Sequence, residues 1–359
     1  MLAWGINSCI MPLFFIMSGY LAAQLASDRE PRSFLKHRLS RLGLPLLVGF
    51  VLVLPADLYV WVLGWVTQGL IPWSSLRRLS FPDELDAALW GPAHLWYLEF
   101  LLIYSLVAGM VLSSRFPAAI QRHFQIEKLS KVWRDPAGLL SLTLASLCCG
   151  LILWRQPRVL IGFNNGILPP WENLLFFAVP FSLGWMRKQQ ELHQPVTVTR
   201  RSRTAWQLAV SAVLGLMLVP QLQWHLAHET QPAAAALPPF LFAAFGLTFA
   251  SGLFGLALLW KGPKAPAAIA YLAAASFWIY LAHHPLTGLV NIAFQSWNRP
   301  AWIEFAMANL IVVAMCLASY EVGVRRTWLG RVLNGTRQTI RPATESLPKE
   351  QPQSVSRAA

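Results

Sequence analysis

The stretch LGLPLLVGFVLVLPADLYVWVLGWV, residues 42–66, decides the fold of this chain. It holds a single charged side chain, Asp57, and a helix of this length crosses the roughly 30 Å of hydrocarbon in a bilayer at about 1.5 Å per residue. Backbone groups find no hydrogen-bonding partner in lipid, so the stretch must be helical, and Pro45 and Pro55 must kink the helix rather than end it. The stretch therefore predicts a transmembrane helix.

Similar apolar runs recur along the whole 359-residue chain. Hydrophobic residues make up 55% of it and charged residues 13%, against roughly a quarter charged in soluble domains. A water-soluble fold would lack the polar surface to cover 17 Trp and 20 Phe side chains. We therefore predict an all-α fold, a polytopic integral membrane helical bundle of about nine transmembrane helices. The nine spans lie near residues 2–25, 42–66, 94–113, 139–154, 171–186, 205–224, 238–260, 267–290 and 302–324.

The basic residues fix the expected orientation in the membrane. Alternate connections, beginning with the one after the first span and ending with the C-terminal tail, hold 24 of the 29 Lys and Arg residues. Because cytoplasmic loops are enriched in Lys and Arg, these connections and the C-terminus are predicted to be cytoplasmic. The expected location is the bacterial inner membrane, with multiple passes. The net charge of +13 then reflects the basic residues of the cytoplasmic connections, and nucleic acid is not an expected partner.

The two ends of the chain differ from the apolar middle. With nine spans and a cytoplasmic C-terminus, the N-terminus falls outside, although residues 1–8 carry no charge and no signal-peptide pattern. We therefore expect that a preceding segment is missing. Beyond Gly330 the chain becomes rich in Ser, Gln, Pro and Glu. This change predicts a transmembrane domain over 1–328 and a disordered cytoplasmic tail over 329–359.

Cysteine spacing and short motifs exclude several familiar kinds of site. The four cysteines lie in apolar runs without a CxxC pair or a histidine at ligand spacing, so neither disulfides nor a metal site is predicted. No GxSxG, Walker or GxGxxG motif occurs. The chemistry must therefore depend on single polar residues within the spans.

Ionisable side chains inside the spans are the candidate functional residues, because burying them in lipid is costly. Asp57, Glu99 and His283 fall within roughly 4 to 8 Å of the midplane in the outer half, at about 1.5 Å per residue. His94 and His284 lie nearer the outer edge. A carboxylate and an imidazole at matched depth can form a general acid/base pair. The alternative for each residue is a structural polar contact between helices.

Helical phase separates some of these candidates. His94 and Glu99 are five residues apart and point about 140° from each other, whereas Trp96 and Glu99 share a face. His94 is interpreted mainly as an interfacial residue that opens its helix. Asp57, His94 and Trp96 are nevertheless predicted as possible cavity-lining residues.

The consecutive residues His283, His284 and Pro285 indicate a polar site more strongly than the isolated ionisable residues do. Pro285 lacks a backbone donor and crowds the carbonyl of Leu281, which loosens the helix around both imidazoles. A local break at this depth is how membrane proteins build polar sites, so His283 and His284 are predicted to be catalytic together with Glu99. The alternative is a helix end with two hydrated histidines.

Arg38 and Arg41 lie where the second span begins on the predicted cytoplasmic side. Three residues apart, their guanidinium groups share one helical face and can hold phosphates with paired hydrogen bonds. By spacing alone, the two arginines fit equally well as topology charges beside anionic lipid headgroups.

Six blocks of sequence occur in a family-specific order over nearly the whole chain. The most specific are HLWYL at 94–98 and IYLAHHPLT within 276–287. The others are LFFIMSGYL at 13–21, RLSRLGLP at 38–45, PFSLGW at 180–185, and Tyr320 with Glu321. The chain thereby resembles the membrane acyltransferases of the acyltransferase-3 type, and within that family the glucans biosynthesis protein C group.

The resemblance implies transfer of an acyl group from a cytoplasmic acyl-CoA, succinyl-CoA or acetyl-CoA, to a carbohydrate hydroxyl at or beyond the outer face. For the most similar group this is succinylation of periplasmic glucans, without a further cofactor. It also associates Arg38 and Arg41 with donor handling. The family normally has ten helices, the first carrying an arginine and a histidine regarded as catalytic. No counterpart precedes Met1, so we expect that this chain lacks the first helix.

The sequence therefore predicts a membrane-bound O-acyltransferase whose partners are acyl-CoA, membrane lipid and a periplasmic glucan or related carbohydrate. Two alternatives remain open. A transporter or flippase of glucan or lipid-linked sugar would use the same polar residues, although it favours repeat symmetry between halves, and none is visible. An inactive, truncated member of the family is the other.

Overall fold

The computed structural model describes residues 2–78, 91–113, 139–161, 168–193, 199–227, 237–260 and 266–334. All regular structure in these ranges is helical, which confirms the predicted all-α fold. The structure places a helix at each of the nine predicted spans. Eight of the nine long segments contain the helices α1 (Leu2–Ser27), α7 (Trp96–Ser113), α10 (Leu139–Arg155), α11 (Trp171–His193), α12 (Thr199–Ala227), α13 (Leu237–Leu259), α14 (Ala267–Phe294) and α15 (Ala301–Ser319).

The remaining span is a composite helix. It runs through α2 (Pro31–Arg38), a π turn at Leu39–Gly43, α3 (Leu44–Val48), a second π turn at Gly49–Val53 and α4 (Leu54–Thr67). Short helical pieces complete the described structure: α5 (Ser75–Arg78), α16 (Trp328–Asn334), 3₁₀ turns at Ala93–Leu95 and Pro157–Ile161, and a π turn at Tyr320–Val324.

Length and hydropathy make six of the described helical segments candidate membrane spans, including the composite helix and α15 with its terminal π turn. Helix α10 is apolar but shorter. The chain is thus a multi-pass membrane protein. The predicted tail begins inside α16, and residues 335–359 lie outside the described ranges.

Prolines in the predicted spans do not end the helical segments, as predicted for Pro45 and Pro55. Each π turn of the composite helix ends just before a proline, Pro45 in α3 or Pro55 in α4. A proline lacks the backbone N–H and clashes with the carbonyl four residues earlier, and a π turn widens the helix at that point. Pro180 and Pro285 lie inside α11 and α14.

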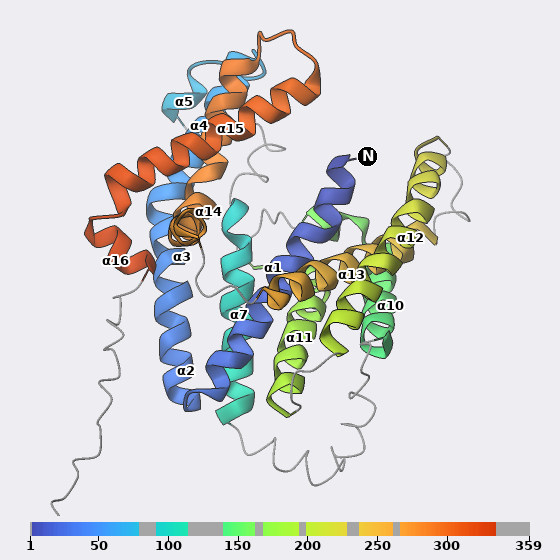
Figure 1. The fold of residues 1–359 in the computed structure, drawn as a ribbon. Helices are drawn as coiled ribbons and strands as arrows, with labels where there is room; N and C mark the ends of the chain where they lie inside the picture. The colour runs from blue at the N-terminus through green and yellow to red at the C-terminus, as the bar shows by residue number, and fades with distance from the viewer. Residues whose placement is uncertain are drawn as a thin grey trace, which may run out of the picture.

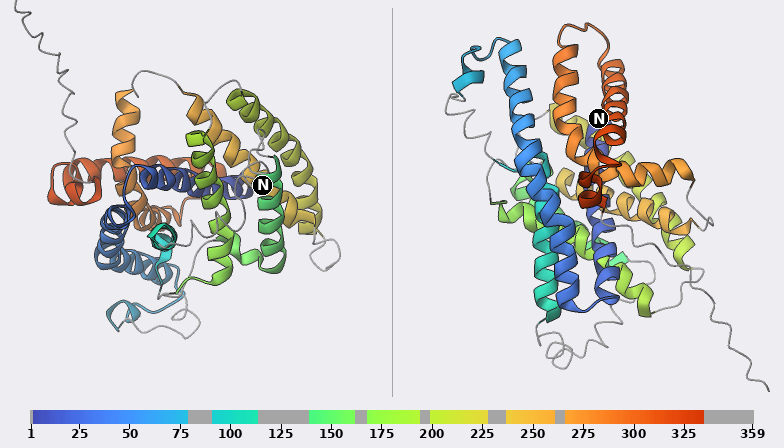
Figure 2. Two further views of the ribbon diagram at one scale, coloured as in Figure 1. Left: turned by 90° about the horizontal axis from the view of Figure 1, so that it is seen from below. Right: turned by 90° about the vertical axis from the view of Figure 1, so that its left-hand side faces the viewer.

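The helices form two packed groups (Figures 1 and 2). In one group, α1 packs on α11 and α13, and α13 packs on α10 and α12. In the other, α14 packs between α15 and α4, while α2 packs on α7. Aromatic contacts join the groups: the fully buried Phe15 of α1 lies against Trp96 and Tyr97 at the start of α7. The start of α7 is therefore held between α1 on one side and α14 on the other.

Helices α1 and α11 cross at two glycines. A Cβ atom on Gly19 would collide with the carbonyl of Phe181, and one on Gly184 would collide with the carbonyl of Ile16. Each glycine thus lets the partner backbone approach where a side chain would stand. This is the close packing that small residues give membrane helices, and it fixes α1 for its contacts with α7.

Candidate active site

Three polar side chains from separate helical segments meet inside the second group. Asp57 lies in the first turn of α4, His94 in the 3₁₀ turn before α7, and His284 near the middle of α14. The Asp57 Oδ1 atom is 2.7 Å from His284 Nδ1, and its Oδ2 atom is 3.9 Å from His94 Nδ1. The Asp57 and His94 side chains are only 5% and 6% exposed, and that of His284 is 22% exposed. We call these three residues the Asp57 cluster.

The backbone of α14 determines the orientation of His94. Its Nε2 atom is 3.0 Å from the carbonyl oxygen of Leu281, and a carbonyl only accepts, so Nε2 carries the proton and donates. Tyr280 donates its hydroxyl to the carbonyl oxygen of His94 at 2.6 Å. Ala93 adopts a φ of +44°, in the left-handed region that non-glycine residues seldom occupy. These features turn the Nδ1 atom of His94 toward Asp57.

Sequence reasoning interpreted His94 as an interfacial residue. The residue does lie in the turn that precedes α7, but its ring is buried and faces α14. The left-handed Ala93 and the 3₁₀ turn produce this direction. Extending an ideal helix back from Glu99 does not predict it.

His284 packs between two rings. Its imidazole stacks on that of His94, with 4.8 Å between centroids and 11° between planes, and the centroid of the Trp61 ring is 5.3 Å away. The Trp61 Nε1 atom is 3.3 Å from His284 Nδ1. Trp61 is one turn beyond Asp57 on α4, so both reach the same face of α14.

His283 has a different environment from its neighbour. Its Nδ1 atom is 2.7 Å from the carbonyl oxygen of Tyr280, so Nδ1 donates to its own helix. The lone pair of His283 is then on Nε2. The ring is half-buried, and its centroid is 5.5 Å from that of His94. His283 therefore presents a proton-accepting nitrogen beside the Asp57 cluster.

Glu99 and Trp96 point elsewhere. Among the described residues no hydrogen bond or ion pair joins Glu99 to the histidines, and its buried Oε2 atom has no partner there. Trp96 packs on Phe100 and Phe177 with ring centroids 5.1 and 4.9 Å away. Of the two carboxylates predicted at this depth, the structure therefore brings Asp57 to the imidazoles.

Arg38 and Arg41 lie at the junction of α2 and the first π turn. The Arg38 guanidinium lies over the Phe34 ring, and its buried Nε atom has no hydrogen-bond partner in the described part of the chain. Arg41 donates from Nη1 to the carbonyl oxygen of Leu333 at 2.8 Å, near the end of α16. Arg38 thus keeps hydrogen-bonding capacity, while Arg41 also holds the terminal helix in place.

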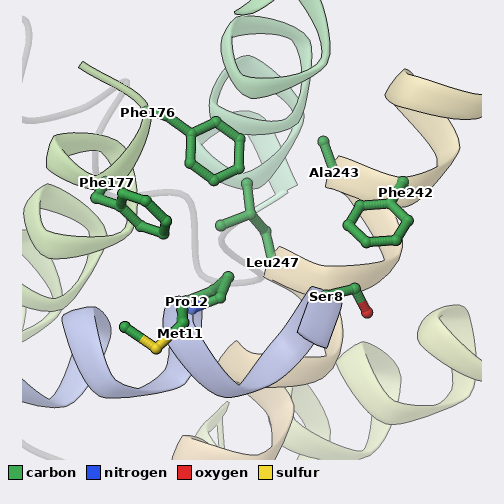
Figure 3. Close-up of a pocket in the computed structure, with 8 residues that line it drawn as sticks. All are labelled: Ser8, Met11, Pro12, Phe176, Phe177, Phe242, Ala243 and Leu247. Carbon is green, nitrogen blue, oxygen red and sulfur yellow. The ribbon is translucent and has the colours of Figure 1, made fainter. Parts of the chain in front are cut away.

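Two pockets lie away from the Asp57 cluster. Figure 3 shows one between α1, α11 and α13, whose lining is apolar apart from Ser8. Its residues are Ser8, Met11, Pro12, Phe176, Phe177, Phe242, Ala243 and Leu247. The other includes Arg187, Gln190 and Arg203, and Arg203 donates to Gln190 at 3.3 Å. Neither contains a carboxylate or imidazole that acid/base chemistry needs.

The Asp57 cluster offers three possible metal ligands, one from each residue, all within 4.8 Å of one another. The spacing of the cysteines predicted no metal, and sequence reasoning did not consider these three residues together, because they are far apart along the chain. The contacts that join them depend on tertiary structure alone.

A comparison with known protein families identifies the family of this chain. The Acyltransferase domain family matches residues 2–321. The chain belongs to this family. The match covers every element that carries the candidate residues, from Arg38 to His284. The described helices and the family together make the protein a membrane acyltransferase.

The individual proteins that are similar to this acyltransferase share only low sequence identity with it. The Glucans biosynthesis protein C of Escherichia coli strain 536 is 23% identical over 344 residues, which cover 92% of this chain and 82% of the relative. The protein of the same name from Shigella dysenteriae serotype 1 has the same identity and coverage. No solved structure matches the chain.

Proposed function

We propose that this acyltransferase moves an acyl group, succinyl in the first instance, from a cytoplasmic acyl-CoA to hydroxyl groups of a periplasmic glucan. Membership of the acyltransferase family supports group transfer, and the name shared by the relatives supports glucan as the acceptor. The single observation that carries the chemistry is the buried cluster of Asp57, His94 and His284 with His283 beside it. Carboxylate and imidazole groups are brought together there from three parts of the chain.

The basic end of the composite helix is the proposed entry for the donor. Five Lys and Arg residues lie between the end of α1 and Leu42, and positive charge of this kind marks cytoplasmic ends. Arg38 would bind a phosphate group of the acyl-CoA, because a guanidinium forms paired hydrogen bonds with phosphate oxygens. Orientation in the bacterial inner membrane, with the C-terminus in the cytoplasm, is part of this proposal.

The acceptor hydroxyl would reach the histidines from the opposite side. In the transfer step the hydroxyl oxygen attacks the thioester carbonyl carbon, and His283 Nε2 takes the hydroxyl proton. The carbon–sulfur bond then breaks, an ester forms, and the CoA thiolate leaves and receives a proton. His283 suits this role because its Nδ1 donates to the helix and leaves Nε2 as the acceptor. Glu99, with its unpartnered buried oxygen, remains a candidate for orienting the acceptor.

The experiment is acyl transfer by the purified chain in detergent. Succinyl-CoA and a periplasmic-type glucan are supplied together, and free CoA thiol and the mass of the glucan are both measured. We expect thiol release that requires the glucan, together with a glucan mass increase of one succinyl group per event. Acetyl-CoA in parallel tests the identity of the acyl group.

Two results would contradict the proposal. Thiol release that is equal with and without glucan would show hydrolysis rather than transfer. Binding of glucan without modification, together with its uptake into protein-containing vesicles, would instead favour the transporter alternative.

A further inference from the structure

We propose that Asp57, His94 and His284 form a binding site for a divalent first-row transition-metal ion, with Zn²⁺ as the probe. The proposal concerns metal binding, which does not depend on the identity of the acyl donor or acceptor. It is carried by the arrangement of hydrogen-bond donors and acceptors in the cluster.

The first argument is the unpartnered nitrogen of His94. Its Nε2 proton is donated to the Leu281 carbonyl, so in the neutral imidazole the lone pair is on Nδ1, 3.9 Å from Asp57 Oδ2. Nδ1 is buried and has no hydrogen-bond partner among the described residues, and the whole side chain is only 6% exposed. A lone pair facing a carboxylate in a buried site is unfavourable unless a positive charge lies between them. A proton on Nδ1 or a bound metal ion supplies that charge, and the metal content of the protein distinguishes the two.

The second argument concerns His284 Nδ1, which has two competing neighbours. An Nδ1 proton would satisfy the Asp57 carboxylate at 2.7 Å, but the indole N–H of Trp61 at 3.3 Å requires a lone pair there. A single nitrogen does not meet both demands at once. A lone pair on Nδ1 is also the form that binds a metal, and the cation would replace the proton between Nδ1 and Asp57.

The chemistry of the three ligands fits such an ion. Two imidazoles and one carboxylate form a set found in catalytic zinc sites, where a fourth position stays open for water or substrate. The hydrogen bond from His94 Nε2 to a backbone carbonyl is the outer contact that typically orients a metal-bound histidine. His284, the most exposed of the three at 22%, lies on the side where the fourth position would open.

Metal binding requires small and specific movements. Ligand atoms at about 2.0–2.1 Å from a tetrahedral ion lie about 3.3 Å from one another. The 2.7 Å contact between Asp57 and His284 must lengthen, and the 3.9 Å contact between Asp57 and His94 must shorten. The imidazole rings, now nearly parallel, must also tilt, because an ion lies in the plane of each ring that binds it. Rotation of His284 away from Trp61 would lengthen its contact with Asp57 and tilt its ring, whereas shortening the Asp57–His94 contact requires a movement of Asp57 or His94.

The test is metal content of the full chain, purified with an affinity tag that contains no histidine. Protein is equilibrated with Zn²⁺, freed of loose metal by gel filtration, and analysed by mass spectrometry for all first-row metals. We expect about one ion per chain in the wild type. Asp57→Asn and His94→Gln should reduce this to near zero. The control His37→Ala removes a histidine that lies 20 residues before Asp57 on the composite helix, roughly 30 Å away at about 1.5 Å per residue, and it should keep the wild-type value.

A competition titration with a chromophoric chelator gives the second readout. Loss of one ligand should weaken Zn²⁺ binding at least about 100-fold, since changes to outer contacts alone typically cost 10–100-fold. If Asp57→Asn does not fold, His284→Gln at the partly exposed position provides the same comparison. A wild type without stoichiometric metal, or cluster variants that retain as much metal as His37→Ala, would overturn the proposal. Failure of acyl transfer with metal bound would contradict only the proposed function.

Discussion

Replacing Gly184 by alanine tests the close crossing of α1 and α11. The new Cβ atom would collide with the main-chain carbonyl of Ile16, and a main-chain group has no rotamer by which to move away. Overpacking of this kind costs about 1–3 kcal/mol, and a main-chain clash belongs at the upper end. Alanine regains about 0.5–1 kcal/mol of helix propensity over glycine. The expected net loss of stability is therefore about 2 kcal/mol.

Gly64→Ala is the matched control. Gly64 is also a buried helical glycine, but a Cβ atom there would meet the Ile292 side chain at an ordinary 3.5 Å. This variant should be neutral or slightly stabilised. The assay is the temperature at which the detergent-solubilised protein loses its monodisperse gel-filtration peak. Gly184→Ala should aggregate several degrees below the wild type, and Gly19→Ala should behave similarly. If Gly184→Ala matches Gly64→Ala, the two backbones are not in contact.

Four further substitutions test the site. Arg38→Lys should raise the KM for acyl-CoA about 5- to 150-fold, equivalent to about 1–3 kcal/mol for loss of a bidentate charged contact. Arg41→Lys should raise that KM less, because Arg41 is partly engaged by α16. Tyr280→Phe removes the donor to the His94 carbonyl and should lower unfolding stability by about 1–3 kcal/mol, as measured by thermal denaturation. His283→Gln should lower kcat about 10²- to 10⁴-fold with a smaller change in KM; an unchanged kcat would exclude His283 as the base.

The helices were predictable because lipid permits few alternatives. An apolar run such as residues 42–66 has to be helical in a bilayer, so length and composition suffice to locate it. The same reasoning explains why Pro45 and Pro55 interrupt the α-helical pattern without ending the helix. The π turns that accommodate them are local adjustments, and their positions have no separate sequence signal.

The sequence predicted how deep the candidate residues lie in the membrane, but not the direction in which their side chains point. Counting residues placed Asp57, Glu99 and His283 at similar depths and His284 nearer the outer edge, whereas the structure pairs Asp57 with His284. Adjacent residues on a helix point about 100° apart, so depth does not decide which histidine faces Asp57. Rotation of α14 against α4 makes that choice, and it depends on packing between segments more than 200 residues apart.

The sequence marked His94 as a possible cavity-lining residue but did not predict the direction of its ring. The ring is aimed at Asp57 by the left-handed Ala93 and by hydrogen bonds to Tyr280 and Leu281 on another helix. Likewise, the bond from Arg41 to Leu333 joins the first basic segment to a helix that sequence reasoning assigned to the tail. Both contacts depend on tertiary structure, which periodicity and charge patterns do not encode.

The most direct test of the central claim is acyl transfer across a sealed membrane. The chain is reconstituted into vesicles that enclose the glucan, and labelled succinyl-CoA is added outside. We expect label to appear in the enclosed glucan while the vesicles stay intact, from the molecules whose basic end faces outward, and Arg38→Lys should reduce it. Label that enters glucan only when glucan and succinyl-CoA share one compartment, or no labelled glucan in either arrangement, would contradict the account.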